Sequence, residues 1–392
     1  MDKERYIFEK FRSKFNGDDC AVIGERAYCK DLFVEGVHFR RGWLSLREIG
    51  AKAMLVNISD MIATNARAKY ALLGLALPRE IGTHEIDELC AGVSETAREW
   101  GIRIIGGDTI GSDRIALSVS LIGKCKRPVF RSGARAGDLI AHTGELGSVG
   151  RDLAVLLRDE ISPASSQTQN RNDKISSAQS SSTALQGLNT EASAAQNPGD
   201  EVRSSDDKIL PVRAEPQSLD AETSTQNSVS HSGDDRKSPT SQGFACENSA
   251  PQSSAGENPV PGSGSYRLRE DLRAKISKNS RFVRPVLRDK FFYKAAKLIS
   301  AAMDISDGLV QDLPRLLEAS GVGARWIARP SEAALQSGEE YEILFSFAPK
   351  FLPKIYAIAA KAGVAINIIA EVCPRTPQSS MEFRGSSHHF AP

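Results

Sequence analysis

Aspartates beside glycine or serine recur along the chain, and they are the residues with which this sequence could do chemistry. They occur in five segments: Gly17-Asp-Asp19, Asp31, Ser59-Asp60, Gly106-Gly107-Asp108-Thr109 and Asp304-Ile-Ser306-Asp307-Gly308. Each segment alone has an ordinary explanation, because Asp, Gly and Ser are favoured in turns and at helix N-termini. That explanation weakens for the set, since Asp60 ends an otherwise apolar helical segment and Asp108 follows an apolar stretch and two glycines.

Carboxylates that meet at one end of a sheet repel one another and raise each other's pKa unless cations neutralise them. Carboxylate oxygens suit Mg²⁺, which bridges carboxylates to substrate phosphates. Phosphoryl transfer asks little more of a protein than positioning and charge neutralisation. The aspartate pattern therefore predicts a polyphosphate site held by several Mg²⁺ ions.

The rest of the sequence excludes several classes of protein. It contains no P-loop motif, no G-x-S-x-G nucleophile elbow and no H-E-x-x-H zinc helix. With 50 Lys and Arg against 49 Asp and Glu, and no basic stripe, nothing indicates a nucleic-acid partner. There is no secretory signal or 18-residue apolar run, and the six cysteines form no C-x-x-C pair. We expect a cytoplasmic protein with no membrane or nucleic-acid partner.

Composition changes abruptly near residue 160. Residues 161–265 are rich in Ser, Gln, Asn and Asp, and Phe244 is their only aromatic residue. Such a segment buries too little apolar surface to offset its chain entropy, so it is interpreted as a disordered insertion. We expect an N-terminal domain over residues 1–130 and a C-terminal domain built from residues 131–160 and 266–392.

Short strands alternate with helices on both sides of this segment, which predicts a mixed α/β fold in two parts. Ser45 and Glu48 form a capping box at the start of one helix, and a second helix begins after Thr83. Helices are also expected over 290–299 and 309–317. The predicted strands cover 27–34, 70–77, 102–105, 114–122, 139–142 and 341–347.

Eight motifs in a fixed order carry a family resemblance. They are Gly-Asp-Asp-Cys-Ala-Val-Ile (17–23), Asp-Leu-Phe-Val-Glu-Gly-Val-His-Phe (31–39), Lys-Ala-Met-Leu-Val-Asn-Ile-Ser-Asp-Met (52–61), Gly-Gly-Asp-Thr (106–109), Arg-Ser-Gly-Ala-Arg-Ala-Gly-Asp (131–138), Met-Asp-Ile-Ser-Asp-Gly-Leu (303–309), Ser-Gly-Glu-Glu-Tyr-Glu-Ile-Leu-Phe (337–345) and His-Phe (389–390). Together they resemble the thiamine-monophosphate kinases, members of the aminoimidazole-ribonucleotide-synthetase-like superfamily. The resemblance covers the chain from about residue 5 onward, except the insertion.

The resemblance implies a two-domain fold, with an N-terminal mixed or antiparallel sheet domain and a C-terminal α/β domain. It implies direct in-line transfer of the ATP γ-phosphoryl group to thiamine monophosphate, the last step of thiamine diphosphate biosynthesis. Asp60, Asp108 and Asp307 match catalytic positions. The implied Mg²⁺ ligands are Asp19, Asp31, Asp60, Asp108, Asp304 and Asp307. The implied ATP contacts are Gly107, Asp108, Arg131 and Ser306, and the implied substrate contacts are His38 and Glu339.

The resemblance also implies a homodimer whose N-terminal sheets pair into a barrel, with the ATP site along the seam. The chain departs from the family pattern at two places near the expected site. Cys29-Lys30-Asp31 stands where the family has Ser-Thr-Asp, and Ser387 stands where it has an aromatic partner for the thiamine rings.

Two alternatives remain open on the sequence. The first is another member of the superfamily with the same ATP site, such as aminoimidazole-ribonucleotide synthetase, selenophosphate synthetase or the hydrogenase-maturation dehydratase. Cys20 is not placed as the reactive residue of a selenophosphate synthetase, and the Phe-Ala-Pro end lacks the cysteine of the dehydratase tail. The second is a nucleotide-binding interaction protein that recruits partners through its insertion.

Overall fold

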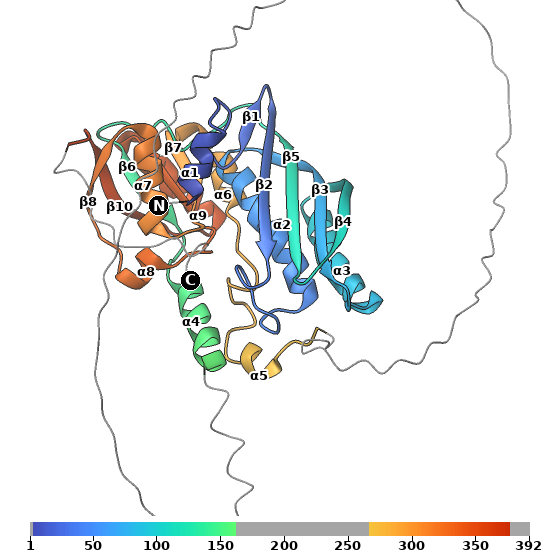
Figure 1. Ribbon diagram of the computed structural model, residues 1–392. Helices are drawn as coiled ribbons and strands as arrows, with labels where there is room; N and C mark the ends of the chain where they lie inside the picture. Colours follow the sequence, from blue (N-terminus) through green and yellow to red (C-terminus); the bar gives the residue numbers. More distant parts are fainter. Residues whose placement is uncertain (1–2, 162–265, 377–392) are drawn as a thin grey trace, which may run out of the picture. The chain divides into compact units, whose positions relative to one another are not determined.

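The computed structural model describes residues 3–161 and 266–376, which belong to one compact unit containing two β-sheets (Figure 1). The predicted insertion over 161–265 lies almost wholly outside the described residues, as do Ser387 and the His389-Phe390 motif. No helix in the described part of the chain has the length and apolar character needed to cross a bilayer.

The first sheet has the strand order β1-β2-β5-β3-β4, and only β3 and β4 run parallel. Its strands are β1 (Ala21–Ile23), β2 (Arg26–Val34), β3 (Arg67–Pro78), β4 (Arg103–Ser112) and β5 (Ala116–Lys124). Helices α2 (Leu46–Ala63) and α3 (Thr83–Glu99) cover one face of this sheet (Figure 1). The alternation predicted for 114–122 is confirmed, because Leu117, Val119 and Leu121 are buried toward the helices.

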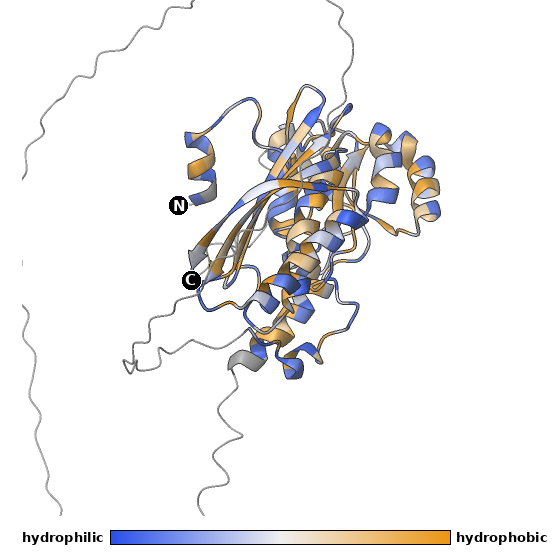
Figure 2. Cartoon of the chain, turned by 90° about the vertical axis from the view of Figure 1, so that its right-hand side faces the viewer, coloured by the Kyte–Doolittle hydropathy of each residue, from blue (hydrophilic) through white to orange (hydrophobic). Residues whose placement is uncertain are grey.

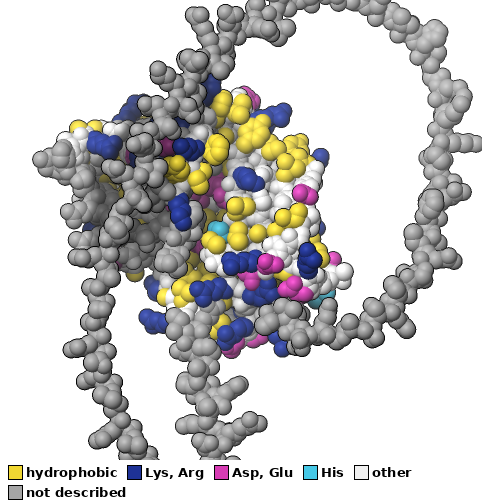
Figure 3. Space-filling model, viewed as in Figure 1, with side chains coloured by type: hydrophobic (Ala, Val, Ile, Leu, Met, Phe, Trp, Pro, Cys, Tyr) yellow, Lys and Arg dark blue, Asp and Glu magenta, His cyan; other side chains and the backbone are white. Residues whose placement is uncertain are grey.

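The opposite face of the first sheet carries exposed apolar side chains. Figure 3 shows hydrophobic side chains gathered over these strands. The exposed set on this face comprises Ile23, Tyr28, Leu32, Tyr70, Leu72 and Ile110, and the edge strand β4 also exposes the adjacent Ile104 and Ile105. Contiguous apolar surface of this kind marks an interaction face more often than free surface.

The second sheet is antiparallel throughout, with the order β7-β9-β6-β10-β8. Its strands are β6 (Leu139–Thr143), β7 (Ala301–Asp304), β8 (Gly323–Trp326), β9 (Ile343–Phe347) and β10 (Ile366–Cys373). The remaining helices are α1 (Lys3–Lys10), α4 (Ser148–Ile161), α5 (Glu270–Arg273), α6 (Asp289–Ala295), α7 (Leu309–Ser320), α8 (Glu332–Gln336) and α9 (Leu352–Ala362), with 3₁₀ turns at Ala296–Leu298 and Pro349–Phe351.

Both faces of the second sheet are covered, because its strands contribute to two buried clusters. Figure 2 shows hydrophobic and hydrophilic residues interspersed along the helices and strands of the chain. Met303 and Leu344 pack in one buried cluster with Leu313 of α7. Alternate strand residues such as Phe345 pack in the other cluster with α6 and α9. A sheet covered on both faces has a rigid edge, and that edge carries Asp304 at the end of β7.

Helix α2 connects the two parts because it packs against the first sheet, α3, β7 and α6. The predicted capping box is present: Ser45 Oγ accepts from the Glu48 N–H at 3.2 Å, and Glu48 Oε2 accepts from the Ser45 N–H at 2.8 Å. The helix is buried on nearly every side. Its last turn therefore delivers Asp60 to the contact between the sheets.

Three predicted boundaries are wrong. β4 does not stop at Ile105 but continues through Asp108 to Ser112, because Gly107 permits close pairing: a Cβ there would overlap the Leu73 carbonyl. The helix predicted over 290–299 spans only Asp289–Ala295 before a 3₁₀ turn. The last predicted strand begins at Ile343, because Tyr341 has a φ of 49° that no strand residue adopts.

The α2–α3 contact depends on glycine. A Cβ at Gly92 would overlap the backbone carbonyl of Arg47, and one at Gly50 would overlap that of Leu89. Gly92→Ala is expected to lower the free energy of unfolding by about 2–3 kcal/mol, because rigid backbone must move apart. Urea titration measures this loss. Ser94→Ala, at an exposed position of the same helix, is the control, and equal stability of both variants would contradict the close contact.

Candidate metal and phosphate site

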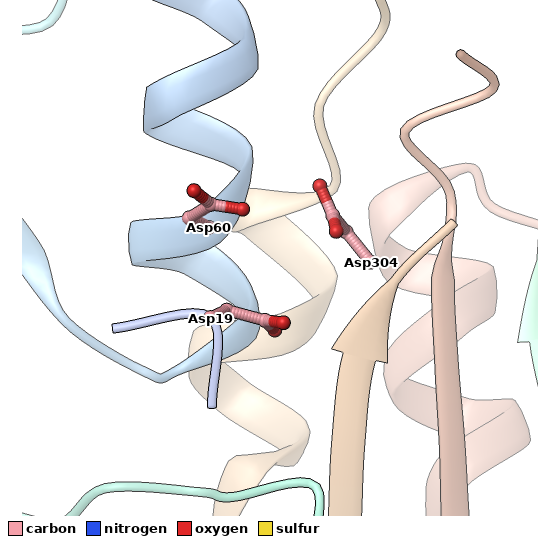
Figure 4. A group of neighbouring side chains, drawn as sticks. All are labelled: Asp19, Asp60 and Asp304. Atoms are coloured by element: carbon pink, nitrogen blue, oxygen red, sulfur yellow. The ribbon is translucent and has the colours of Figure 1, made fainter. Parts of the chain in front are cut away.

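Three aspartates from distant parts of the chain meet at one point. Asp19 precedes β1, Asp60 lies in the last turn of α2 and Asp304 ends β7. One carboxylate oxygen from each lies within 4.8 Å of the other two, and Figure 4 shows the three side chains converging. The convergence predicted for these three residues is therefore present.

Burial and mutual repulsion make this cluster electrostatically unfavourable without cations. Burial raises the pKa of Asp60 well above its ordinary value, and the charges of Asp31 and Asp304 raise it further. The pKa of Asp304 is likewise raised well above its usual range by burial and by Asp19, against a hydrogen bond from Ser59. Burial also raises the pKa of Asp19, although Arg131 opposes that shift.

The donor set fits Mg²⁺. Every oxygen in the cluster is a hard carboxylate ligand, and three carboxylates at this separation suit a small divalent ion that keeps some of its waters. Of the three aspartates, Asp19 is the one that Arg131 hydrogen-bonds, through Nε and Nη2 at 2.9 and 2.7 Å from Oδ1. The carboxylate of Asp60 has no hydrogen bond or ion pair among the described residues, so a cation is the group that would neutralise it.

A cavity of about 540 Å³ surrounds the three aspartates. The structure brings nine of the eleven predicted site residues to its lining: Asp19, His38, Asp31, Asp60, Arg131, Asp304, Ser306, Asp307 and Glu339. Asp31 donates its backbone N–H to Asn57 Oδ1 at 3.0 Å, and Asp307 pairs with Arg315 at 2.5 Å. The lining therefore combines carboxylates for cations with fixed cationic groups.

Gly107 and Asp108 are not brought to this cavity. Both lie in β4, where Asp108 is exposed and accepts the N–H of Thr109 at 2.9 Å. Strands β5 and β3 lie between β2 and β4. At the usual strand spacing, β2 and β4 are therefore about 14 Å apart. The contacts of Gly107 and Asp108 with ATP and metal stay predictions. In this single copy of the chain, neither residue lines the cavity.

Glu339 lies in a backbone conformation that side chains rarely adopt. Its φ is 55° and that of Tyr341 is 49°, and Asn65 is the one other such non-glycine residue among residues 3–161 and 266–376. The Glu339 N–H donates to the Ser306 carbonyl at 2.7 Å, and its Oε2 lies 2.6 Å from Lys52 Nζ. Strain of this kind persists where the surroundings fix it, and it clusters at functional sites.

A second pocket of about 380 Å³ adjoins the cavity. The two share His38 and Glu339 in their linings, and the second pocket adds the aromatic residues Phe39, Trp43 and Phe282. His38 Nδ1 accepts the Val34 N–H at 3.0 Å, so the neutral ring carries its proton on Nε2. The site thus has an acidic part and an aromatic part with two residues between them.

Sequence reasoning missed Lys52, Asp18, Arg315 and Tyr341. Lys52 is fully buried, and its ammonium lies 4.1 Å from the centre of the Phe282 ring. A signal for it exists in the sequence, because Lys52, Val56 and Asp60 recur every four residues on one face of an apolar helix. Asp18, Arg315 and Tyr341 line the cavity through loop and helix geometry that spacing does not reveal.

The glycine loop after β6 has a structural role. Gly144 and Gly147 lie between β6 and α4, where the backbone N–H groups of a glycine loop could bind phosphate or the glycines could only turn the chain. The N–H groups of Gly147 and Val149 donate to Oε1 of the buried Glu340, at 2.6 and 3.3 Å. A carboxylate of the protein thus occupies the donors that a phosphate would use.

The raised pKa values predict a stability that depends on pH and metal. Folded aspartates with raised pKa bind protons that the unfolded chain releases, so their contribution to stability is complete below about pH 4 and is lost as pH rises. Burial and the charge of Asp307 raise the pKa of Asp312 to about 7. Part of the stability is therefore lost near neutral pH. In chelator, the melting temperature is expected to fall between pH 5 and pH 8, and Mg²⁺ is expected to raise it most at pH 8.

Asp60→Asn removes one repelling charge and one metal ligand. Calorimetry in chelator at pH 8 is expected to give a higher melting temperature than wild type, with the Mg²⁺-induced rise lost. In wild type that rise corresponds to about 2.7 kcal/mol at a hundredfold excess of Mg²⁺ over Kd. Asp113→Asn, at an exposed turn position, serves as control. A full Mg²⁺ response in Asp60→Asn would remove Asp60 from the metal site.

Comparison with known proteins places the chain among AIR synthase related proteins. Their N-terminal domain matches residues 17–125, and their C-terminal domain matches residues 268–379. The chain is 34% identical over 166 residues to the thiamine-monophosphate kinase of Aquifex aeolicus (strain VF5), covering 40% of this chain and 53% of that protein. It is 35% identical over 161 residues to that of Bacillus subtilis (strain 168), covering 39% and 49%. The chain thus spans about half the length of the curated relatives it matches.

Solved structures share the fold. AaThiL complexed with AMPPCP and TMP superposes with a TM-score of 0.59 at 22% identity, covering 95% of this chain and 90% of that one. The thiamine-monophosphate kinase from Stenotrophomonas maltophilia K279a gives 0.56 at 19%, covering 95% and 93%. The HypE–HypF complex gives 0.55 at 14%, again covering 95% and 93%. The two-domain fold expected from the resemblance is confirmed.

Proposed function

The chain belongs to the AIR synthase related proteins, whose two domains together match more than half of it, and we propose that it phosphorylates thiamine monophosphate with ATP. The product is thiamine diphosphate. The observation that carries this proposal is the convergence of Asp19, Asp60 and Asp304 on a cavity that adjoins an aromatic pocket. The curated relatives are thiamine-monophosphate kinases, and one similar structure is complexed with AMPPCP and TMP.

The carboxylates of Asp19, Asp31, Asp60, Asp304 and Asp307 would hold Mg²⁺ beside the triphosphate of ATP. Bound Mg²⁺ would supply neutralisation of phosphate charge, which is the main requirement of phosphoryl transfer. Arg131 orients Asp19 through its two hydrogen bonds, and Ser306 offers a hydroxyl at the same lining. These groups hold the γ-phosphorus in line between the acceptor oxygen that forms the new bond and the β–γ bridging oxygen that leaves.

The aromatic pocket takes the acceptor. Phe39, Trp43 and Phe282 line this pocket, and aromatic side chains suit a heterocycle such as the pyrimidine or thiazolium ring of thiamine. Trp43 is 3% exposed, and its Nε1 has no acceptor among the described residues, which suits a donor awaiting a ligand. His38 and Glu339, shared by the two spaces, position the acceptor phosphate at the boundary.

The Lys52–Glu339 ion pair fixes this boundary. Lys52 is fully buried, so losing its contact with Glu339 would leave its charge uncompensated. That cost keeps Glu339 in its strained backbone conformation. Lys52 is thereby a positioning residue that acts through Glu339. The same helix presents Asp60 two turns later, so α2 sets the spacing between acceptor and metal.

Purified protein with Mg²⁺ and ATP is expected to convert thiamine monophosphate to thiamine diphosphate. Asp60→Asn is expected to lower turnover at least about 100-fold, because charge compensation dominates this chemistry. Chromatographic separation of the two thiamine esters measures both. Asp113→Asn should keep the wild-type rate. A folded protein that forms no product at millimolar substrate would reject the proposed acceptor.

Other acceptors are tested in the same assay. The fold also matches the HypE–HypF complex, so fold alone does not choose the acceptor. The identity above 30% is with thiamine-monophosphate kinases, which favours thiamine monophosphate. ATP consumption with another phosphate acceptor, and none with thiamine monophosphate, would favour a different member of the superfamily.

A homodimer accounts for the exposed sheet face and for Asp108. The ten-residue strand β4 leaves a long unpaired edge, and the edge of β2 away from β5 has no partner strand in the described sheet beyond Tyr28, where its pairing with β1 ends. Two sheets that close into a barrel bring opposite edges together, so the β4 edge of one copy faces the β2 edge of the other, with the nucleotide along the seam between them. Asp108 of each copy then approaches the cavity of the other.

Subunit mixing tests this arrangement. Asp60→Asn and Asp108→Asn are each expected to be inactive alone. After exchange of subunits at equal amounts, half of the dimers are mixed, and each mixed dimer has one intact site, so activity returns to about a quarter of wild type. Sedimentation velocity confirms that both variants are dimers. Mixed samples that stay inactive while exchanging subunits would show that Asp108 does not act across the interface.

A further inference from the structure

One lysine and two arginines line the cavity that contains the three aspartates. Both arginines form ion pairs with carboxylates. Arg131 binds Asp19, and Arg315 pairs with Asp307 at 2.5 Å and with Asp312 at 3.2 Å. The third is Lys30, which makes no ion pair within the described residues. Its ammonium instead donates a hydrogen bond to the hydroxyl of Ser118 on β5.

Lys30 and the metal-binding carboxylates lie on opposite faces of β2. Successive strand residues point to opposite sides of a sheet, so Lys30 shares the outer face with Tyr28 and Leu32, whereas Cys29 and Phe33 are buried on the inner face. The ammonium therefore avoids the acidic cluster although the cavity wall contains six aspartates: Asp18, Asp19, Asp31, Asp60, Asp304 and Asp307.

Residues from both faces of β2 nevertheless line the cavity. β1 pairs with β2 only as far as Tyr28, so the edge from Cys29 onward has no partner strand in the described sheet. Four successive residues, Lys30 to Phe33, line the cavity. A ligand that lies along this edge can meet Asp31 from one side and Lys30 from the other.

We propose that Lys30 is a phosphate-binding residue, whose ammonium contacts a non-bridging oxygen of the ATP triphosphate across the edge of β2 from the metal-binding carboxylates. A triphosphate is long and multiply charged, so it can hold metal ions on one side and a fixed cation on the other. Ser118 holds the side chain along the strand before the ligand arrives. Lys30 stands where the family pattern has threonine, so the contact belongs to this chain. The inference deepens the proposed function and rests on it for the identity of the nucleotide.

A fixed cation changes how the site depends on metal. Mg²⁺ must be bound from solution, whereas the ammonium is present at any Mg²⁺ concentration. Lys30 thus supplies part of the charge neutralisation that otherwise requires a further ion. Nucleotide binding in chelator is the property that isolates this contribution.

Calorimetric titration with AMPPCP, in chelator and in excess Mg²⁺, tests the assignment. Lys30→Thr and Lys30→Met are expected to weaken AMPPCP binding in chelator by about 10-fold, because a charge-assisted hydrogen bond is lost. The effect should shrink in excess Mg²⁺, and Lys30→Arg should retain most of the affinity. In turnover, Lys30→Thr should raise the KM for ATP at limiting Mg²⁺ with a smaller change in kcat.

Lys69→Thr is the matched control, since Lys69 is an exposed lysine of β3 in the same sheet that does not line the cavity. Melting curves confirm that each variant is folded. Affinity of Lys30→Thr and Lys30→Met within twofold of wild type in chelator would overturn the assignment, as would the absence of AMPPCP binding by wild type under both conditions.

The two proposals fail separately. If wild type phosphorylates thiamine monophosphate while Lys30 variants bind AMPPCP normally, the kinase proposal stands and the role of Lys30 is wrong. If wild type forms no thiamine diphosphate but Lys30→Thr still loses AMPPCP affinity, the nucleotide contact stands and the acceptor is wrong.

Discussion

Repulsion among buried carboxylates is the constraint around which the rest of the molecule is organised. Asp19, Asp60 and Asp304 come from a loop, a helix end and a strand end, and burial raises the pKa of each. A protein that folds against this repulsion needs rigid elements to enforce it. Helix α2 provides one, since it packs between both sheets and is itself held by the glycine contact with α3. The covered second sheet provides the other.

The same helix links the acidic cavity to the aromatic pocket. Lys52 lies two turns before Asp60 and pairs with Glu339, whose positive φ shows that its position is enforced by its surroundings. A single element thereby sets the spacing between the acidic cavity and the aromatic pocket. The proposed transfer between two phosphates would depend on that spacing, because donor and acceptor oxygens must lie in line with the phosphorus.

Sequence reasoning singled out the three converging aspartates because their residue type is anomalous where it occurs. Asp60 interrupts an apolar helix, and the structure places it beside Asp19 and Asp304. The C-terminal end of β4 could not be predicted, because glycines normally end strands. Here Gly107 lies inside the strand, since the close pairing with β3 leaves no room for a Cβ. The helical spacing between Lys52 and Asp60 could have identified Lys52 as a residue of the site. The backbone conformation of Tyr341 could not be predicted, because it depends on tertiary contacts that no local sequence pattern records.

Divalent cations that join these carboxylates to a nucleotide can be located by anomalous diffraction from crystals grown with Mn²⁺ and AMPPCP. We expect metal peaks within about 2.5 Å of carboxylate oxygens of Asp19, Asp60 and Asp304, with phosphate oxygens completing the coordination. Nucleotide bound with no metal in contact with any of the three aspartates would contradict it.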